Sequence, residues 1–137
     1  MGLKETERKD LVKFRLGKAK ETFAEVPVQI ENKFYRTAAN RLYYACFYAA
    51  MALLINDGYE AHTHSGVKTL LGLHYINENK LAASFGKTYN HLFNMRQKGD
   101  YFDLVAINED DITPLIEPAN EFINSIEQLI FKNTNTS

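Results

Sequence analysis

The stretch FYRTAANRLYYACFYAAMALLI, from Phe34 to Ile55, decides the fold of this chain. It contains neither proline nor glycine, and it is so rich in alanine, a strong helix former, that it favours a helix over a strand. Its large apolar side chains recur at three- and four-residue steps, so they share one wide face of that helix. These side chains are Tyr44, Phe47, Tyr48, Met51, Leu54 and Ile55.

Apolar residues also fall elsewhere around this helix. Tyr43 and Leu53 lie off the wide face, so hydrophobic atoms cover most of the circumference, as in a helix that is buried or spans a membrane. Only residues 42–55 are free of charge, and this run is too short to span a bilayer. We therefore expect a central helix that other helices pack against on several sides, and no membrane association.

Four further helices are predicted around the central one. The first covers about residues 4–25 and ends before Pro27, because proline disfavours helical backbone in the residue that precedes it. Asn32 is predicted to cap the start of the central helix. Gly58 is predicted to end the central helix in the left-handed backbone conformation.

The other three helices follow the central one along the chain. Thr63 or Ser65 is a suitable cap for the next helix, and Gly99 is predicted to end the one after it. The segment 99–108 is interpreted as a packed loop, because a lone strand would have no partner. The predicted helices cover about 65–77, about 80–98, and a last stretch that begins at Asn108 or Thr113.

Length and composition indicate one domain with a proper core. The 137 residues are 45% hydrophobic, with a predicted core at about 4–131 and a polar tail at 132–137. Five helices with short connections predict an all-α, up-and-down helical bundle of about five helices. The single cysteine, Cys46, cannot form an internal disulfide, and the N-terminus lacks the apolar stretch of a signal peptide. We expect a cytoplasmic protein.

Charge is balanced overall but unevenly distributed. The formal net charge is −1, so the whole-molecule charge does not indicate nucleic-acid binding. Residues 4–20 carry seven basic groups against three acidic ones, whereas residues 108–137 carry six acidic groups against one lysine. Two interpretations remain open: the first and last helices lie near each other or have solvated faces, or the first presents a basic edge to phosphates.

Three segments, in this order, resemble the HEPN superfamily. RLYYACFYAA, from Arg41 to Ala50, resembles its RxYYAxFYAA stretch. Thr63 to Gly66 reads THSG, and RQKGDY from Arg96 to Tyr101 resembles RxxxDY. The resemblance covers about residues 5–130 and implies a helical bundle that commonly forms a homodimer. It also implies toxin or antitoxin subunits, often paired with a nucleotidyltransferase, or modules that bind nucleotide or RNA.

The sequence departs from the catalytic pattern of that family. Many HEPN proteins are metal-independent RNases with a His four to six residues after an Arg, but Tyr101 stands five residues after Arg96. RNA cleavage needs groups that remove and donate protons, and a phenol with a pKa of about 10 is a poor base at pH 7. We therefore expect a non-catalytic binding or interaction module. The alternative is a divergent, metal-independent RNase that acts as a dimer through Arg96, Tyr101 and His64.

Polar residues that interrupt the apolar helices form a candidate phosphate- or nucleotide-binding site. A guanidinium group matches the geometry of a phosphate. Alternatively, both arginines have a structural role and do not bind a ligand. In that case Arg41 forms an ion pair with an acid such as Asp100. Arg96 then forms an ion pair with Asp100 or Asp103 and caps the end of its helix. The candidate binding residues are Asn40, Arg41, Tyr44, Arg96, Lys98 and Tyr101.

Two histidines, His62 and His64, form an HxH pattern in a predicted loop. A zinc ion needs three or four protein ligands, and no nearby acid or cysteine completes the set. We therefore expect neither a metal nor a cofactor. His64 is interpreted as a hydrogen-bonding residue at the start of a helix, or as a substitute base near Arg96.

Overall fold

The computed structural model describes the backbone of residues 4–101 and 106–132 and the side chains of residues 4–97 and 106–132. Within these ranges the chain forms five α-helices and one π-helical segment and contains no strand, so the predicted all-α bundle is confirmed. The elements are α1 (Glu5–Glu31), α2 (Tyr35–Asn56), α3 (His64–Leu71), the π-helix η1 (Gly72–Ile76), α4 (Ala83–Tyr101) and α5 (Glu109–Lys132).

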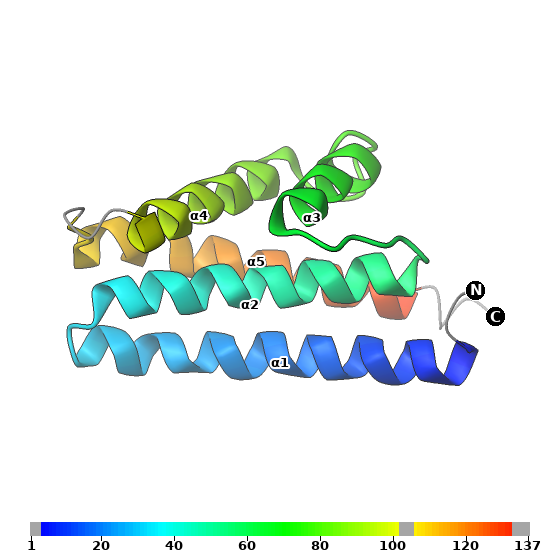
Figure 1. The fold of residues 1–137 in the computed structure, drawn as a ribbon, viewed down its shortest axis with the longest axis horizontal. Helices are drawn as coiled ribbons and strands as arrows, with labels where there is room; N and C mark the ends of the chain where they lie inside the picture. The colour runs from blue at the N-terminus through cyan, green and yellow to red at the C-terminus, as the bar shows by residue number, and fades with distance from the viewer. Residues whose placement is uncertain (1–3, 102–105, 133–137) are drawn as a thin grey trace.

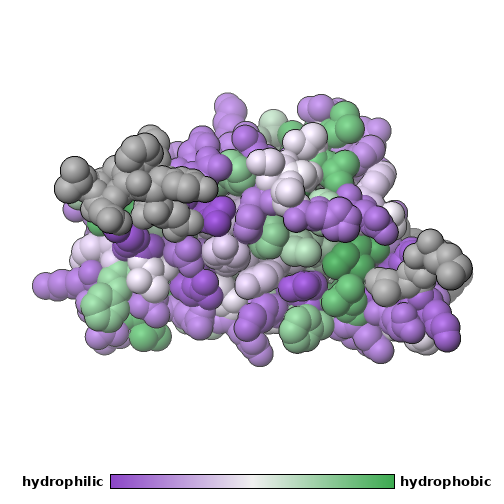
Figure 2. Space-filling view, in the orientation of Figure 1, coloured by the Kyte–Doolittle hydropathy of each residue, from purple (hydrophilic) through white to green (hydrophobic). Residues whose placement is uncertain are grey.

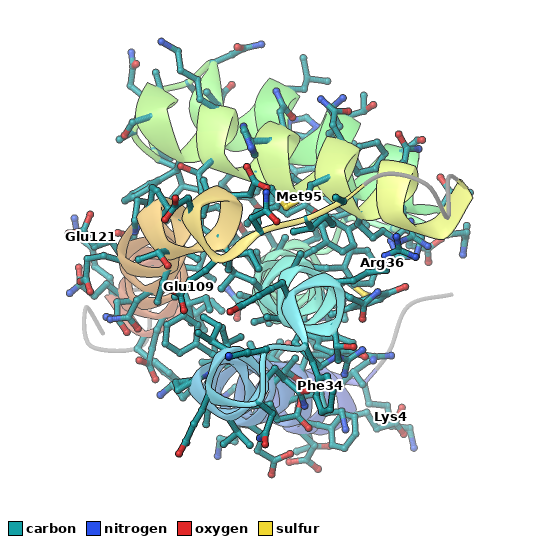
Figure 3. The ribbon with its side chains drawn as sticks, turned by 90° about the vertical axis from the view of Figure 1, so that its left-hand side faces the viewer. Lys4, Phe34, Arg36, Met95, Glu109 and Glu121 are labelled. Atoms are coloured by element: carbon teal, nitrogen blue, oxygen red, sulfur yellow. The ribbon has the colours of Figure 1, made fainter. Side chains whose placement is uncertain are left out.

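The helices are arranged around α2. α1 and α2 form an antiparallel pair, and α5 lies beside α2 and runs in the same direction (Figure 1). The end view in Figure 3 shows α4 as an outer layer over α2 and α5, with α1 on the opposite side. α2 contacts α1, α3, α4 and α5, which confirms its prediction as the central helix.

The wide aromatic face of α2 is not its most buried face. Tyr44 and Phe47 are half-buried, whereas Tyr43 and Leu53 are only 0% and 1% exposed. The most buried positions include small side chains that let the backbones of neighbouring helices approach closely. These small residues are Ala38, Ala39, Ala45, Cys46, Ala49, Ala50 and Ala52.

The length of α2 does not by itself exclude a membrane span. Among the described residues, α2 is the one helix long and apolar enough to cross a bilayer, so the argument from its short uncharged run was wrong. Its burial favours a different role, because 61% of its most apolar window lies inside the bundle. These properties are those expected of the core helix of a packed domain.

Two predicted helix ends are confirmed. Gly58 has a φ of 84°, and the N–H groups of Gly58 and Tyr59 donate to the carbonyls of Ile55 and Leu54, as in a Schellman motif. At the start of α3, the Thr63 hydroxyl accepts a hydrogen bond from the Gly66 N–H at 2.9 Å. The sequence allowed either Thr63 or Ser65 as the cap of α3, and the structure shows that Thr63 is the cap.

The prediction that Pro27 ends the first helix was wrong. α1 continues through Pro27 to Glu31, because the loss of one backbone hydrogen bond does not outweigh the packing of the helix on α2. Asn32 does not cap α2 either. It ends α1, where its side-chain amide donates to the Val28 carbonyl at 2.8 Å, and Lys33 takes the left-handed conformation with φ 61°.

The boundaries around Gly99 also differ from the prediction. α4 continues through Gly99 to Tyr101, since one glycine inside a helix costs only about 1 kcal/mol. Part of the predicted loop 99–108 is therefore helical, and residues 102–105 lie outside the described part of the chain. α5 begins after Asn108, whose N–H donates to the Asp111 carboxylate at 2.8 Å, so Asn108 and not Thr113 marks its start.

The first and last helices lie close together, as one interpretation of the charge pattern predicted. α1 contacts α5, and the Lys20 ammonium forms an ion pair with Glu127. The face of the molecule in Figure 2 is mainly hydrophilic, with separate hydrophobic patches. Opposite charges on α1 and α5 therefore interact with each other within the fold, as the pair Lys20–Glu127 shows.

Overpacking of α2 tests its central place. Ala49 is fully buried, so the larger leucine side chain in Ala49→Leu must displace packed atoms. This substitution should lower the free energy of unfolding by about 1–3 kcal/mol in urea titrations. The matched control is Ala24→Leu at an exposed position of α1, which should change stability by about 0.5 kcal/mol or less. Equal effects of the two substitutions would contradict the buried position of α2.

Candidate functional site

Two consecutive tyrosines of α2 form the centre of the site. Adjacent helical residues point in different directions, so Tyr43 is fully buried while Tyr44 is only half-buried. Their rings meet edge to face, with centroids 5.2 Å apart and planes at 76°. Tyr43 therefore links the site to the core, and Tyr44 gives it an accessible aromatic surface.

Two guanidinium groups approach the ring of Tyr44 from different helices. The Cζ of Arg41, one turn earlier on α2, lies 5.4 Å from the ring centroid. The Cζ of Arg96, on α4, lies 5.7 Å from the same centroid and 5.6 Å from that of Tyr43. These are cation–π distances. Arg41, Tyr44 and Arg96, here called the arginine cluster, are thus three predicted site residues that the fold brings together.

Arg41 has two further partners. Its Nη2 donates to the Asn40 side-chain carbonyl at 2.9 Å, and its Nη1 lies 3.7 Å from a carboxylate oxygen of Glu25 on α1. The predicted partner Asp100 has a side chain outside the described part of the structure. Glu25 is 52% exposed, so this ion pair is a weak surface contact that solvent and salt screen.

His64 packs beside the arginine cluster. Its Nδ1 lies 2.7 Å from the hydroxyl of Tyr43, which makes a hydrogen bond between α2 and the first residue of α3. Its ring lies 4.4 Å from that of Phe47 and contacts Tyr44 edge to face at 5.7 Å. The THSG segment therefore has two structural roles: Thr63 caps α3, and His64 faces the tyrosines of α2.

His62 does not join this arrangement. Its side chain is 87% exposed, and its Nε2 lies 4.0 Å from the carboxylate of Glu60. The two histidines of the HxH pattern therefore face different surroundings. Within the described ranges, no group of three or more His, Cys, Asp or Glu side chains gathers to hold a metal ion.

Burial sets the protonation state of Tyr43. Loss of hydration is the main cause that raises the pKa of its phenol from 10.0 to about 12, and the nearby Arg96 and Tyr89 lower it by less. Burial likewise raises the pKa of Tyr89 well above its usual value. Both phenols are therefore neutral at physiological pH, and each has one proton to donate.

Three predicted site residues cannot be placed in the cluster. Lys98, Asp100 and Tyr101 follow Arg96 in the last turns of α4, but their side chains lie outside the described part of the structure. Conversely, the sequence analysis missed Tyr43 and Glu25. Tyr43 could have been found from its hydroxyl, which lies on the core side of α2, because a buried hydroxyl needs a hydrogen-bond partner.

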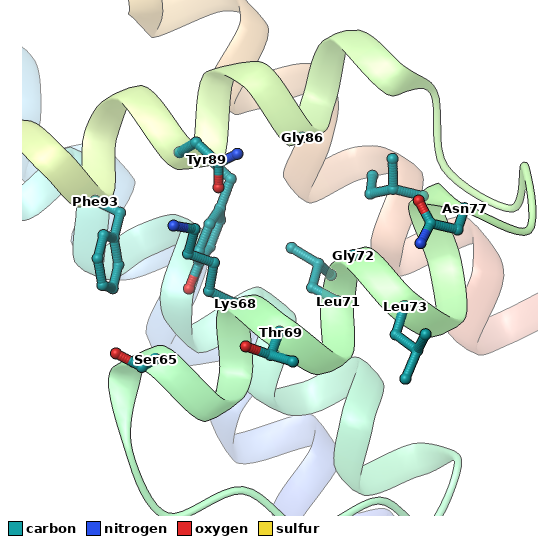
Figure 4. Close-up of a pocket in the computed structure, with 12 residues that line it drawn as sticks. Ser65, Lys68, Thr69, Leu71, Gly72, Leu73, Asn77, Gly86, Tyr89 and Phe93 are labelled. Atoms are coloured by element: carbon teal, nitrogen blue, oxygen red, sulfur yellow. The ribbon is translucent and has the colours of Figure 1, made fainter.

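A separate cavity of about 550 Å³ lies between α4 and the continuous stretch of α3 and η1 (Figure 4). The ring of Tyr89 forms part of its wall, together with polar residues such as Ser65, Lys68 and Asn90. The Lys68 ammonium lies 4.8 Å from the centroid of the Phe93 ring. Among the side chains that the structure describes, none of those predicted to bind phosphate lines this cavity.

The geometry of the arginine cluster suits an anion more than a proton-transfer reaction. Guanidinium groups remain charged at any physiological pH and match the oxygens of a phosphate. The half-buried ring of Tyr44 holds both cations and offers a surface on which a planar group can stack. The cluster therefore has the parts of a binding site for a phosphorylated or otherwise anionic ligand.

Comparison with known proteins gives one consistent family. The family model described as "HEPN domain" matches residues 12–129. A UPF0332 protein of Thermotoga maritima is 32% identical over 124 residues, which cover 90% of this chain and 94% of the relative. A Methanocaldococcus jannaschii protein named as a candidate toxin is 31% identical over 112 residues, covering 82% of this chain and 83% of the relative. A second candidate toxin of that organism is 31% identical over 103 residues, which cover 74% of this chain and 70% of the relative.

The raised pKa of Tyr43 predicts a loss of stability in alkali. The folded chain holds this proton up to about pH 12, whereas the unfolded chain releases it near pH 10, so the stabilisation is present below pH 10 and is lost as the pH rises toward 12. Between pH 8 and pH 11, wild type should lose about 1 kcal/mol of unfolding free energy relative to Tyr43→Phe in urea titrations. Identical pH dependence of the two proteins would contradict the burial of this phenol.

Proposed function

The chain belongs to the HEPN family, and from that premise we propose that it binds the phosphate group of a nucleotide or of RNA at the arginine cluster. The observation that carries the proposal is that two guanidinium groups, one from α2 and one from α4, lie 5.4 and 5.7 Å from the centroid of the same tyrosine ring. Two positive charges that border the same ring create a local positive potential, which favours an anion beside them.

Preorganisation supports this function. Tyr44 holds both cations by cation–π contacts, and Asn40 fixes the Arg41 fork, so an incoming phosphate does not have to order either side chain fully. The partner Glu25 is exposed and 3.7 Å from Arg41, a weak contact that a phosphate oxygen can replace. Lys98 and Tyr101, which follow Arg96 on α4, are proposed as further contacts.

The biological setting that we propose is a toxin–antitoxin-type module. Two relatives in Methanocaldococcus jannaschii are named as candidate toxins, and they cover most of this chain. In this proposal the chain forms a homodimer and works with a nucleotidyltransferase as its partner protein. Light scattering on the purified chain tests the dimer. Co-purification with the product of a neighbouring gene tests the partner, and a monomer that retains no partner would contradict this setting.

A divergent RNase is the second candidate function. It is favoured by the position of His64, whose ring contacts the same Tyr44 ring that Arg96 approaches. In that case cleavage of single-stranded and structured RNA continues in the presence of a chelator and disappears in Arg96→Ala. Absence of cleavage from wild type, or equal cleavage by both proteins, removes this candidate and leaves the binding function.

Removal of one guanidinium tests the binding site. Arg96→Ala should weaken binding of AMP and of a short single-stranded RNA about tenfold or more in calorimetry, because charge-assisted hydrogen bonds are lost. The matched control is Arg15→Ala on α1, where the guanidinium also lies over an aromatic ring, Phe14, at 5.8 Å. The control should keep wild-type affinity. Equal losses in the two variants, or no binding by folded wild type, would refute the proposed function.

Removal of the competing carboxylate should have the opposite effect. Glu25→Gln frees Arg41 from an exposed ion pair, so phosphate affinity should rise by about two- to fivefold, the equivalent of a surface ion pair. The same titrations with AMP measure it, with Glu21→Gln, an exposed acid one turn earlier on α1, as the control. Unchanged or weaker binding in Glu25→Gln would show that Arg41 does not meet the phosphate.

A further inference from the structure

The cavity between α4 and the stretch formed by α3 and η1 contains a single charge. Among the described residues that line it, Lys68 is the one charged side chain, and no carboxylate of the described residues forms an ion pair with it. Its ammonium group lies 4.8 Å from the centroid of the Phe93 ring instead. Lys68 is half-buried, so its charge is screened less than that of an exposed lysine. The cavity therefore attracts an anion.

The two ends of the cavity differ in chemistry. Figure 4 shows Lys68 extending from α3 toward α4, between Tyr89 and Phe93, with Leu73 toward the opposite end. Apolar side chains line the rest of this space, and Ile76 lies about 10 Å from Lys68 along the axis of α3 and η1. A ligand that fills the cavity thus meets a cation at one end and hydrocarbon along its length.

The start of η1 leaves room for such a ligand. A Cβ atom added at Gly72 would meet no atom within 4 Å, so the space beside this residue is open. The Asn77 N–H donates to the Gly72 carbonyl at 2.9 Å across a π-helical turn, and both residues line the cavity. π-Helical turns occur frequently at functional sites.

Neutral donors accompany the one cation. Ser65 lies one turn before Lys68 on α3, Asn90 lies one turn before Phe93 on α4, and both line the cavity. A hydroxyl and an amide can each donate to an oxygen atom that the ammonium holds. One positive charge with neutral donors suits a carboxylate, which has a single negative charge, better than it suits a doubly charged phosphate.

We propose that this cavity is a binding site for a small amphipathic carboxylate, whose charged group meets Lys68 and whose apolar body lies along α3 and η1 toward Leu73. The volume of about 550 Å³ is in the range of pockets that hold small molecules. The site goes beyond the phosphate binding proposed above. It uses a different cation, and no described residue of the arginine cluster lines the cavity.

Octanoate, a linear carboxylate of suitable length, is the probe. In calorimetry on the full chain it should bind with a Kd of about 1 mM or below, the affinity expected of about ten non-hydrogen atoms in a fitting site. In ¹H–¹³C spectra it should shift the methyl signals of Leu71, Leu73 and Ile76. Octyltrimethylammonium, which has the same chain and the opposite charge, should bind about tenfold more weakly or not at all.

Neutralisation of the lysine tests the charged end. Lys68→Gln should weaken octanoate binding about three- to tenfold, since a partly exposed, charge-assisted contact is lost. The matched control is Lys87→Gln, which removes an exposed lysine of α4 that does not line the cavity and should keep wild-type affinity. An unchanged affinity in Lys68→Gln, or equal losses in the two variants, would overturn the role of Lys68.

Filling the open space tests the apolar end. Gly72→Leu should weaken octanoate binding about tenfold or more, because the leucine side chain occupies the place of the ligand. Gly17→Leu is the matched control, since a Cβ added at this exposed glycine of α1 also meets no atom within 4 Å. Thermal unfolding checks that the variants fold.

Three results would refute the proposed site. They are no octanoate binding by folded wild type, equal affinity for the cationic analogue, and equal effects of Gly72→Leu and Gly17→Leu. The octanoate titrations do not depend on AMP binding, so failure of the arginine cluster as a phosphate site leaves this test intact.

Discussion

The structure depends on the need of α2 to bury almost its whole circumference. Its small residues let α1 approach on one side, while α3, α4 and α5 cover others. This constraint gives the adjacent residues Tyr43 and Tyr44 different environments. Tyr43 enters the core and must find hydrogen-bond partners there, and Tyr44 remains half-buried where charged groups can reach it. Both the stability of the fold and the chemistry of the site follow from this one helix.

The candidate site is assembled by packing and not by a local motif. Arg41 comes from the start of α2, Arg96 from the second half of α4, and His64 from the first residue of α3. They meet because the aromatic rings of α2 that join the helices also contact the cations and the imidazole. Arg96 contacts the rings of both tyrosines, but only Tyr44 is also partly exposed, so a ligand can reach the cations at its ring. The half-buried face of α2 is therefore the face on which we propose the binding site.

Periodicity and turn chemistry predicted most of the fold because they reflect local physics. The central helix, Gly58 as its end and Thr63 as a cap follow from side-chain spacing and backbone preference. The failures at Pro27 and Gly99 have the opposite cause, since packing can carry a helix past a residue that disfavours it. The π-helical turn of η1 and the pairing of Arg41 with residues far along the chain depend on tertiary contacts that periodicity does not encode.

Cooperation between the two arginines is the central claim, and a double-mutant cycle on AMP binding measures it. The cycle compares wild type, Arg41→Ala, Arg96→Ala and the double variant in calorimetry, with thermal unfolding as a check of the fold. If both guanidiniums hold one phosphate, the double variant loses less binding free energy than the two single variants added together, by about 0.5–3 kcal/mol. Losses that add within about 0.5 kcal/mol, or a single variant without any loss, would contradict one shared anion site.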